Sequence, residues 1–177
     1  MRIADLNALD DDAAVRELLH CCGSSRWARM MAAARPFARV AAIEQAADDA
    51  WQALEGADVQ EAFAAHPKIG GAGEAGTAGE AGRDGAPPWS AQEQSGVRAA
   101  TDDVRERLAA GNRAYQARFG YIFIICATGK SAAEMLASLE QRLRNTPAEE
   151  LRIAAEEQRK ITRLRLTKLL DQEQKTP

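Results

Sequence analysis

The sequence has few of the side chains that bind metals or form disulfides. Its 177 residues include three cysteines and two histidines. Cys21 and Cys22 are adjacent and Cys126 stands alone, which argues against a disulfide framework. No cysteine or histidine cluster has the spacing of a zinc site, so we expect no metal. Any chemistry that needs an imidazole must use His20 or His66.

Aromatic residues, long apolar runs and basic excess are also lacking. Aromatics make up 5% of the chain while alanine is abundant, a mixture that suits helices better than sheets. No stretch approaches the roughly 18 apolar residues of a membrane helix. A net charge of -3 lacks the basic footprint of a nucleic-acid binder. The ends carry no secretory or peroxisomal signal, which favours a cytoplasmic protein.

Apolar periodicity predicts an all-α chain that folds as one compact helical bundle over residues 1–177. The expected helices cover residues 10–22, 24–35, 40–54, 59–65, 90–119, 131–145 and 147–169. Residues 121–127 form a continuous apolar run, either a buried extended segment or a buried helical turn, and periodicity does not decide between them.

Residues 70–88 contain seven of the 13 glycines and predict a flexible loop. Residues 71–76 match the GxGxxG pattern. They follow no predicted strand and open no helix, so a nucleotide site is the weakest functional interpretation.

Three polar residues are candidates for chemistry. His66 precedes Pro67, whose ring restricts the backbone, and it is either a helix-end surface residue or a proton-transfer group at the mouth of a pocket. Glu93 closes a capping box with Ser90, yet it also lies at the start of a buried stripe. Arg165 interrupts the apolar row of Ile161 and Leu169, which indicates either a buried ion pair or a clamp for an anionic substrate.

Other polar residues are given structural roles. Asn112 and Tyr115 lie near the buried side of the helix predicted over 90–119 and are expected to form hydrogen bonds in the core. Cys126 is expected to be buried and unreactive. Arg159 and Arg163 occupy a separate helical row and are expected to be solvated.

Taken together, these motifs resemble the family of 2-oxo-4-hydroxy-4-carboxy-5-ureidoimidazoline (OHCU) decarboxylases, which produce (S)-allantoin. The matching elements are His66-Pro67 with Ile69-Gly70, Ser90-x-x-Glu93-Gln94-Ser95, Asn112-x-x-Tyr115, Phe119-Gly120-Tyr121-x-Phe123 to Ala127, Lys130, Arg142-Leu143-x-Asn145 and Lys160-Ile161-x-x-Leu164-Arg165-Leu166. They cover most of the chain in the family's order, and the run from Phe119 to Ala127 is the most specific. The stretch between Ile69 and Ser90 is longer and richer in glycine than is usual for the family.

The resemblance implies an all-α, cofactor-free homodimer that acts on a ureidoimidazoline. His66 would be the catalytic acid/base, and Glu93 and Arg165 would contact the substrate. The residues implied to line the substrate site are Pro67, Ser90, Ala91, Gln92, Gln94, Phe123, Ile124, Ile125, Cys126 and Ala127. A neighbouring C=N group of the substrate can accept the electron pair that stays behind when CO2 leaves, so no organic electron sink is needed.

Two alternatives remain open from the sequence. A helical interaction module would have exposed apolar stripes, and His66, Glu93 and Arg165 would not converge. A different enzyme with the same fold would act on another ureido compound or hydrolyse a ring. Identification of the product distinguishes that enzyme from a decarboxylase.

Overall fold

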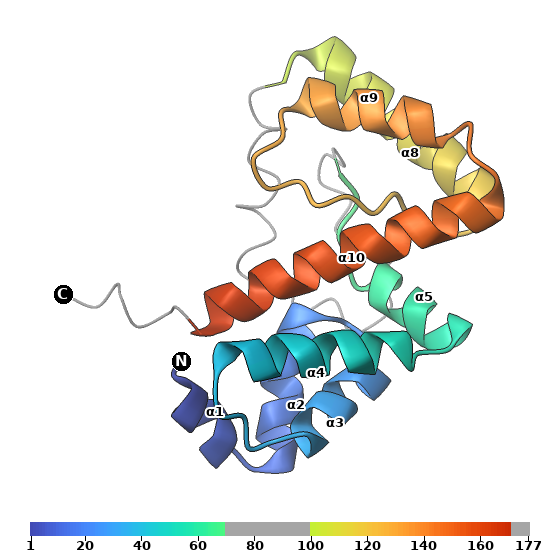
Figure 1. Cartoon of the computed structure of the whole chain (residues 1–177). Helices are drawn as coiled ribbons and strands as arrows, with labels where there is room; N and C mark the ends of the chain where they lie inside the picture. The colour runs from blue at the N-terminus through green and yellow to red at the C-terminus, as the bar shows by residue number, and fades with distance from the viewer. Residues whose placement is uncertain (70–99, 171–177) are drawn as a thin grey trace. The chain divides into compact units, whose positions relative to one another are not determined.

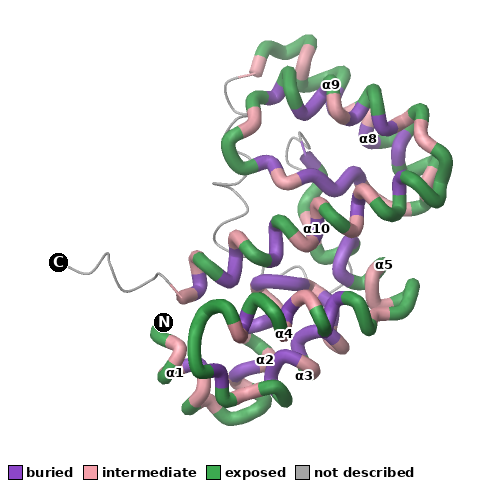
Figure 2. The backbone as a smooth tube through the Cα atoms, viewed as in Figure 1, coloured by how far each residue is buried: buried purple, intermediate pink, exposed green. Residues whose placement is uncertain are grey.

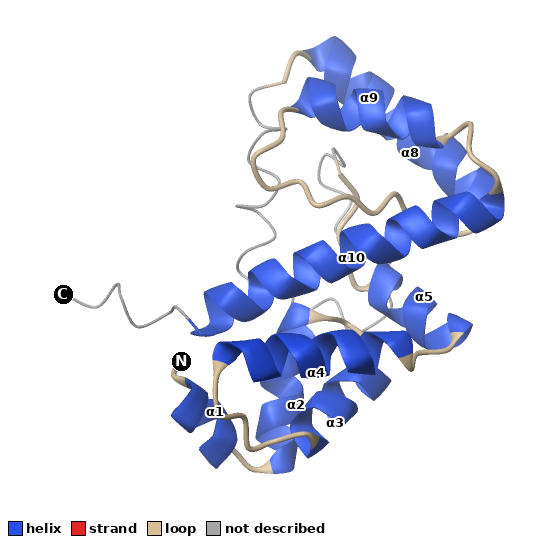
Figure 3. Ribbon diagram, in the orientation of Figure 1, coloured by secondary structure: helices blue, strands red, loops and turns tan. Residues whose placement is uncertain are grey.

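The structure is a computed structural model that describes residues 1–69 and 100–170. Its helices are α1 (Ile3–Ala8), α2 (Asp11–Cys21), α3 (Ser25–Ala33), α4 (Val40–Gln52), α5 (Gly56–Ala64), α8 (Asp102–Phe119), α9 (Ala132–Arg142) and α10 (Pro147–Leu170) (Figure 1). No strand occurs in the two described ranges, and the predicted all-α class is confirmed (Figure 3). The predicted glycine-rich loop at residues 70–88 lies outside the described residues.

Internal contacts divide the chain into two units. Among the described residues, the first unit comprises residues 1–62 and 159–170, and the second comprises residues 63–69 and 100–158. The boundaries fall inside α5 and α10, so each of these helices contributes to both units. That the whole chain forms a single domain stays a prediction.

The first unit is built on capped helices around a core of large side chains. The Asp10 carboxylate accepts a hydrogen bond from Ala13 N at 2.7 Å, and the Ser24 hydroxyl accepts one from Trp27 N at 3.2 Å, so α2 and α3 begin where the sequence predicts. Helix α3 packs against both α2 and α4. The fully buried Trp27 also donates its indole N–H to the carbonyl of Ala47 at 3.1 Å, which ties α3 to α4.

The end of α10 completes this unit with the polar interruption that the sequence predicts. Ile161, Arg165 and Leu169 are only 6%, 4% and 2% exposed, so the guanidinium does lie in an apolar row. The expectation of a solvated side chain is confirmed for Arg163, which is 51% exposed, whereas the Arg159 side chain is only 24% exposed. Both arginines pair with Asp48 of α4, Arg159 at 3.1 Å, because that carboxylate faces their row of the helix.

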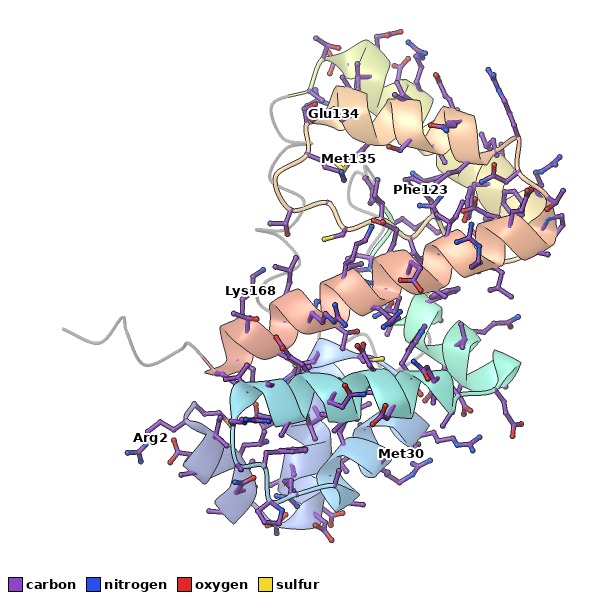
Figure 4. The ribbon with its side chains drawn as sticks, viewed as in Figure 1. Arg2, Met30, Phe123, Glu134, Met135 and Lys168 are labelled. Carbon is purple, nitrogen blue, oxygen red and sulfur yellow. The ribbon has the colours of Figure 1, made fainter. Side chains whose placement is uncertain are left out.

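The second unit has its core between α8, α9 and the segment that joins them. Helix α8 packs against α9, and Gly111 lies so close to Leu139 that a Cβ there would come within 2.6 Å of the leucine side chain. Phe123 and Met135, both labelled in Figure 4, belong to this core with Leu108. Figure 2 shows buried residues, in purple, along α8, α9 and the segment that joins them.

The prediction of one helix over residues 90–119 is wrong at residues 100 and 101. Thr101 has extended backbone angles, and α8 begins at Asp102. The physical reason is visible in the sequence, because Asp102 and Asp103 place two carboxylates in the first turn, where the helix dipole favours negative charge. A periodic apolar stripe obscured this start signal.

The apolar run at residues 121–127 is neither helix nor strand. Helix α8 stops at Gly120, whose positive φ of 81° suits glycine, and the chain then crosses the core without regular structure. The structure therefore favours the buried extended segment over the helical turn, the two interpretations that the sequence left open.

Candidate active site

His66 is held immediately after α5. Its backbone N–H donates to the carbonyl of Phe63 at 3.2 Å, which closes a turn at the end of the helix. Its imidazole Nε2 lies 2.7 Å from Oε1 of Gln158 in α10. His66 is half-buried, whereas Gln158 is fully buried at 0% exposure. The buried amide of Gln158 therefore fixes one edge of the His66 ring. A group that transfers protons needs such a defined orientation.

The chain that follows His66 is anchored by Ile69. The Ile69 side chain is 5% exposed and belongs to the core of the second unit. Its carbonyl accepts a hydrogen bond from Nδ2 of Asn112 at 3.0 Å, and the same amide group donates to Leu108 O at 2.9 Å. The prediction that Asn112 forms hydrogen bonds in the core is confirmed. Pro67 and Lys68, between the two anchors, are exposed.

The Phe123–Ala127 segment is held through its backbone. The carbonyl of Ile124 accepts a hydrogen bond from Nη1 of Arg142 at 2.7 Å, and the N–H of Cys126 donates to the Glu157 carboxylate at 2.8 Å. Side chains of Phe123, Ile124, Ile125 and Ala127 are buried. Cys126 is only half-buried, so the expectation of a fully buried thiol is wrong at this position.

Arg142 is part of a buried polar cluster. Its Nη2 lies 2.5 Å from Oε1 of Glu150, which also accepts a hydrogen bond from the hydroxyl of Tyr115. Asn145 donates to the second carboxylate oxygen at 2.8 Å. Burial and the hydrogen bond to Glu150 both raise the pKa of the Tyr115 hydroxyl, so it stays protonated. The predicted role of Tyr115 as a hydrogen-bonding core residue is confirmed.

Arg165 lies in the first unit, close to the thiol of Cys22. The arginine is 4% exposed, and Cys22 is fully buried. Burial raises the pKa of the Cys22 thiol to about 12, although Thr162 and the positive charge of Arg165 oppose this change. Cys22 is therefore a neutral thiol and supplies no anion to compensate the guanidinium.

The structure brings part of the predicted site together. His66 and Phe123–Ala127 lie in the same unit, where the consecutive residues Glu157 and Gln158 of α10 bind the Cys126 backbone and the His66 ring. Arg165 belongs to the other unit. The remaining predicted residues lie outside the described part of the chain: Ser90, Ala91, Gln92, Glu93 and Gln94. Whether Glu93 caps a helix therefore stays open.

Sequence reasoning missed Gln158, Glu157 and Glu150, and it named Arg142 only as part of the family motif, without a role. A signal for two of them was available, because Glu150, Ala154 and Gln158 form an i, i+4 row that leads into the stripe of Ile161. Glu150, Ala154 and Gln158 are all buried, so the two polar residues of this row needed partners as much as Arg165 did. Their partners could not be read from the sequence, since Tyr115 and His66 are far away along the chain.

Neither a metal centre nor a membrane span is found among the described residues. No group of three or more histidine, cysteine or acidic side chains could hold a metal ion there. None of the described helices is both long and apolar enough to cross a membrane.

Comparison with known proteins identifies the family. The family model for OHCU decarboxylase matches residues 7–167. The chain belongs to the OHCU decarboxylase family. It is 41% identical over 156 residues to the uric acid degradation bifunctional protein TTL of Arabidopsis thaliana, covering 88% of this chain and 47% of that protein.

Other relatives extend the comparison. The 2-oxo-4-hydroxy-4-carboxy-5-ureidoimidazoline decarboxylase of Amia calva is 38% identical over 79 residues, which is 45% of each protein. The chain thus spans about half the length of these curated relatives. A crystal structure of OHCU decarboxylase in the presence of (S)-allantoin aligns with a TM-score of 0.73 and 37% identity, over 92% of this chain and 99% of that one.

Proposed function

We propose that this protein is a cofactor-independent carboxy-lyase that converts OHCU to (S)-allantoin in urate breakdown. Family membership over residues 7–167 supports the reaction class. The observation that carries the chemistry is the imidazole of His66, fixed by a fully buried glutamine in the unit that also holds the Phe123–Ala127 segment. A titratable ring on a rigid support suits a reaction that needs a placed proton.

In this proposal His66 is the acid/base, and Glu93 and Arg165 position the substrate. The planar guanidinium of Arg165 is suited to a carboxylate or carbonyl edge, and its burial strengthens its interaction with an anion. Pro67, residues 90–94 and Phe123–Ala127 line the substrate site. Hydrogen bonds from Arg142 and to Glu157 hold the backbone of Phe123–Ala127, so this segment keeps its shape while the substrate is converted to product.

The reaction needs little from the protein beyond orientation and proton delivery. Loss of CO2 leaves an electron pair that the neighbouring C=N group of the substrate accepts, and a proton then completes the product. Delivery of that proton to one face gives one enantiomer. Positioning and preorganised polar groups can supply the rate enhancement without a metal or an organic cofactor.

We also propose that the protein is a homodimer and that it acts in the cytoplasm on a small ureidoimidazoline, with no nucleic-acid or membrane partner. The family resemblance supports the dimer, and the acidic net charge of -3 supports the lack of a nucleic-acid partner. Light scattering after gel filtration measures the mass directly. A mass of one chain at working concentrations would contradict the dimer.

The function is tested by generating OHCU from urate in situ and following circular dichroism of the allantoin. We expect a fast rise of the (S)-allantoin signal with the native protein and its loss in the His66→Ala variant. His20→Ala is the matched control, because it removes the other histidine of the chain, which lies on α2 beside Glu17. No signal above the spontaneous reaction with native protein would refute the proposal.

Intermediate outcomes are also informative. Equal signals from the native chain and the His66→Ala variant would retain the decarboxylase and remove His66 from the acid/base role. A product other than allantoin would favour a different enzyme on this fold. An interaction module would produce no turnover at all.

A further inference from the structure

The fully buried amide of Gln158 holds the His66 ring in the proposed mechanism, and it also bears on the protonation of that ring. It lies in α10, and its Oε1 is 2.7 Å from Nε2 of His66. Gln158 is 0% exposed, so water cannot replace this contact without a rearrangement. Burying a glutamine side chain costs free energy unless its amide is hydrogen-bonded. Loss of the contact with His66 would therefore be unfavourable.

The contact determines which imidazole nitrogen carries the hydrogen. An amide oxygen only accepts hydrogen bonds, so the atom that faces it must be a donor, Nε2–H. In a neutral imidazole the other nitrogen, Nδ1, then holds the lone pair. In the imidazolium form both nitrogens are protonated, and Nε2–H still donates to the same oxygen. The contact with Gln158 thus survives a change in the charge of the ring.

We propose that Gln158 is a positioning residue that fixes neutral His66 as its Nε2–H tautomer, so that Nδ1 is the nitrogen that exchanges protons during turnover. Nδ1 accepts a proton to form the imidazolium, and releasing that proton restores the neutral ring, with no other bond made or broken in the protein. This inference rests on the proposed acid/base role of His66.

The neighbouring residue of α10 supports the same arrangement. Glu157 accepts the backbone N–H of Cys126 at 2.8 Å, so the turn of helix that carries Gln158 is bound to the Phe123–Ala127 segment. The Gln158 amide is therefore fixed in two ways: its helical turn is bound to another segment, and its side chain is buried. A glutamine on a rigid turn presents only its oxygen to the ring and so selects one tautomer of His66. A mobile glutamine could rotate its amide and present either its oxygen or its NH2 group, so both tautomers would be accommodated.

The tautomer can be measured without any activity. The chain has two histidines, so a His20→Gln variant labelled with 15N-histidine gives imidazole signals from His66 alone. At a pH where the ring is neutral, we expect a protonated, pyrrole-type Nε2 and an unprotonated, pyridine-type Nδ1. The opposite assignment, or an average of the two tautomers, would overturn the proposal.

Two substitutions test the role of the amide oxygen. Gln158→Met keeps the length of the side chain and removes the acceptor, so we expect a mixture of tautomers and a fall in kcat of about tenfold with a smaller change in KM. Gln158→Glu restores an oxygen acceptor, so we expect the Nε2–H tautomer and part of kcat to return. An unchanged tautomer and kcat in Gln158→Met would show that another group selects the tautomer.

The outcomes separate this inference from the proposed function. Loss of (S)-allantoin formation in His66→Ala tests the function, and the nitrogen signals test the tautomer. A native protein with the Nε2–H tautomer and full activity in His66→Ala would leave Gln158 a structural partner and overturn its role in turnover.

Discussion

Arg142 and Glu150 form an ion pair at 2.5 Å in which the side chains are 8% and 0% exposed. Besides this pairing, Arg142 donates to the backbone of Ile124, and Glu150 accepts the Tyr115 hydroxyl. Because the pair is shielded from water, each charge depends on the other for solvation. The pair therefore links the stability of the second unit to the position of the Phe123–Ala127 segment.

Glu150→Ala leaves the Arg142 guanidinium without its buried partner. We expect a loss of about 3–5 kcal/mol in the free energy of unfolding, measured by urea denaturation. The control is Glu140→Ala, which breaks the exposed pair with Arg107, whose side chains are 47% and 54% exposed. That change should cost no more than about 1 kcal/mol. Equal losses in the free energy of unfolding would mean that the buried pair contributes no more to stability than the exposed pair.

Glu157→Ala removes the acceptor that holds the N–H of Cys126. We expect an increase in KM for OHCU of about tenfold, since a hydrogen bond to a charged group contributes roughly 1.5 kcal/mol or more. Glu157→Gln keeps an oxygen acceptor and should have a smaller effect. Glu156→Ala, at the exposed neighbouring position, is the control. If the KM of all three variants equals that of the native protein, this segment is not part of the substrate site.

Cys126 should react with iodoacetamide before Cys21 and Cys22. Cys126 is half-buried, whereas the other two thiols are buried, and burial raises the pKa of Cys22 to about 12. Peptide mapping of partly alkylated native protein gives the order of labelling. If Phe123–Ala127 lines the substrate site, (S)-allantoin should slow the labelling of Cys126. Faster labelling of Cys22 would contradict the burial of this side chain, which directly follows α2.

Glu134 should contribute to stability in a way that depends on pH. Hydrogen bonds from the backbone and hydroxyl of Ser131 lower the pKa of Glu134 below its usual value of 4.5. Its contribution should therefore be complete above 4.5 and disappear as the pH falls through the lowered value. In urea titrations, the difference between native protein and Glu134→Gln should be present at neutral pH and vanish in acid. A difference that persists in acid would refute the capping role.

Most of the secondary structure could be predicted from the sequence, because start and stop signals are local. Asp10, Ser24 and Ser131 cap helices in which apolar residues recur at the helical period. The break before Asp102 was missed, because the apolar stripe of the next helix seemed to continue through it and was given more weight than two adjacent carboxylates.

The candidate site could be predicted only in part. His66 and Arg165 stood out, one as a scarce residue type and the other as a charge in an apolar row. Gln158 forms the contact with His66 across 92 positions of sequence, and such a pairing depends on tertiary packing that no local pattern encodes. The motif at residues 123–127 was recognised by family resemblance, whereas the supporting roles of Arg142 and Glu157 were found only in the structure.

The adjacency of Glu157 and Gln158 has a consequence for how this helix can evolve. Consecutive residues of an α-helix point about 100° apart, so one turn of α10 serves two targets only in a single rotational register. Inserting or deleting one residue between Glu150 and Glu157 would turn both side chains away from their targets together. Natural length variation among relatives should therefore accumulate in connecting loops, and this stretch of α10 should keep a constant length.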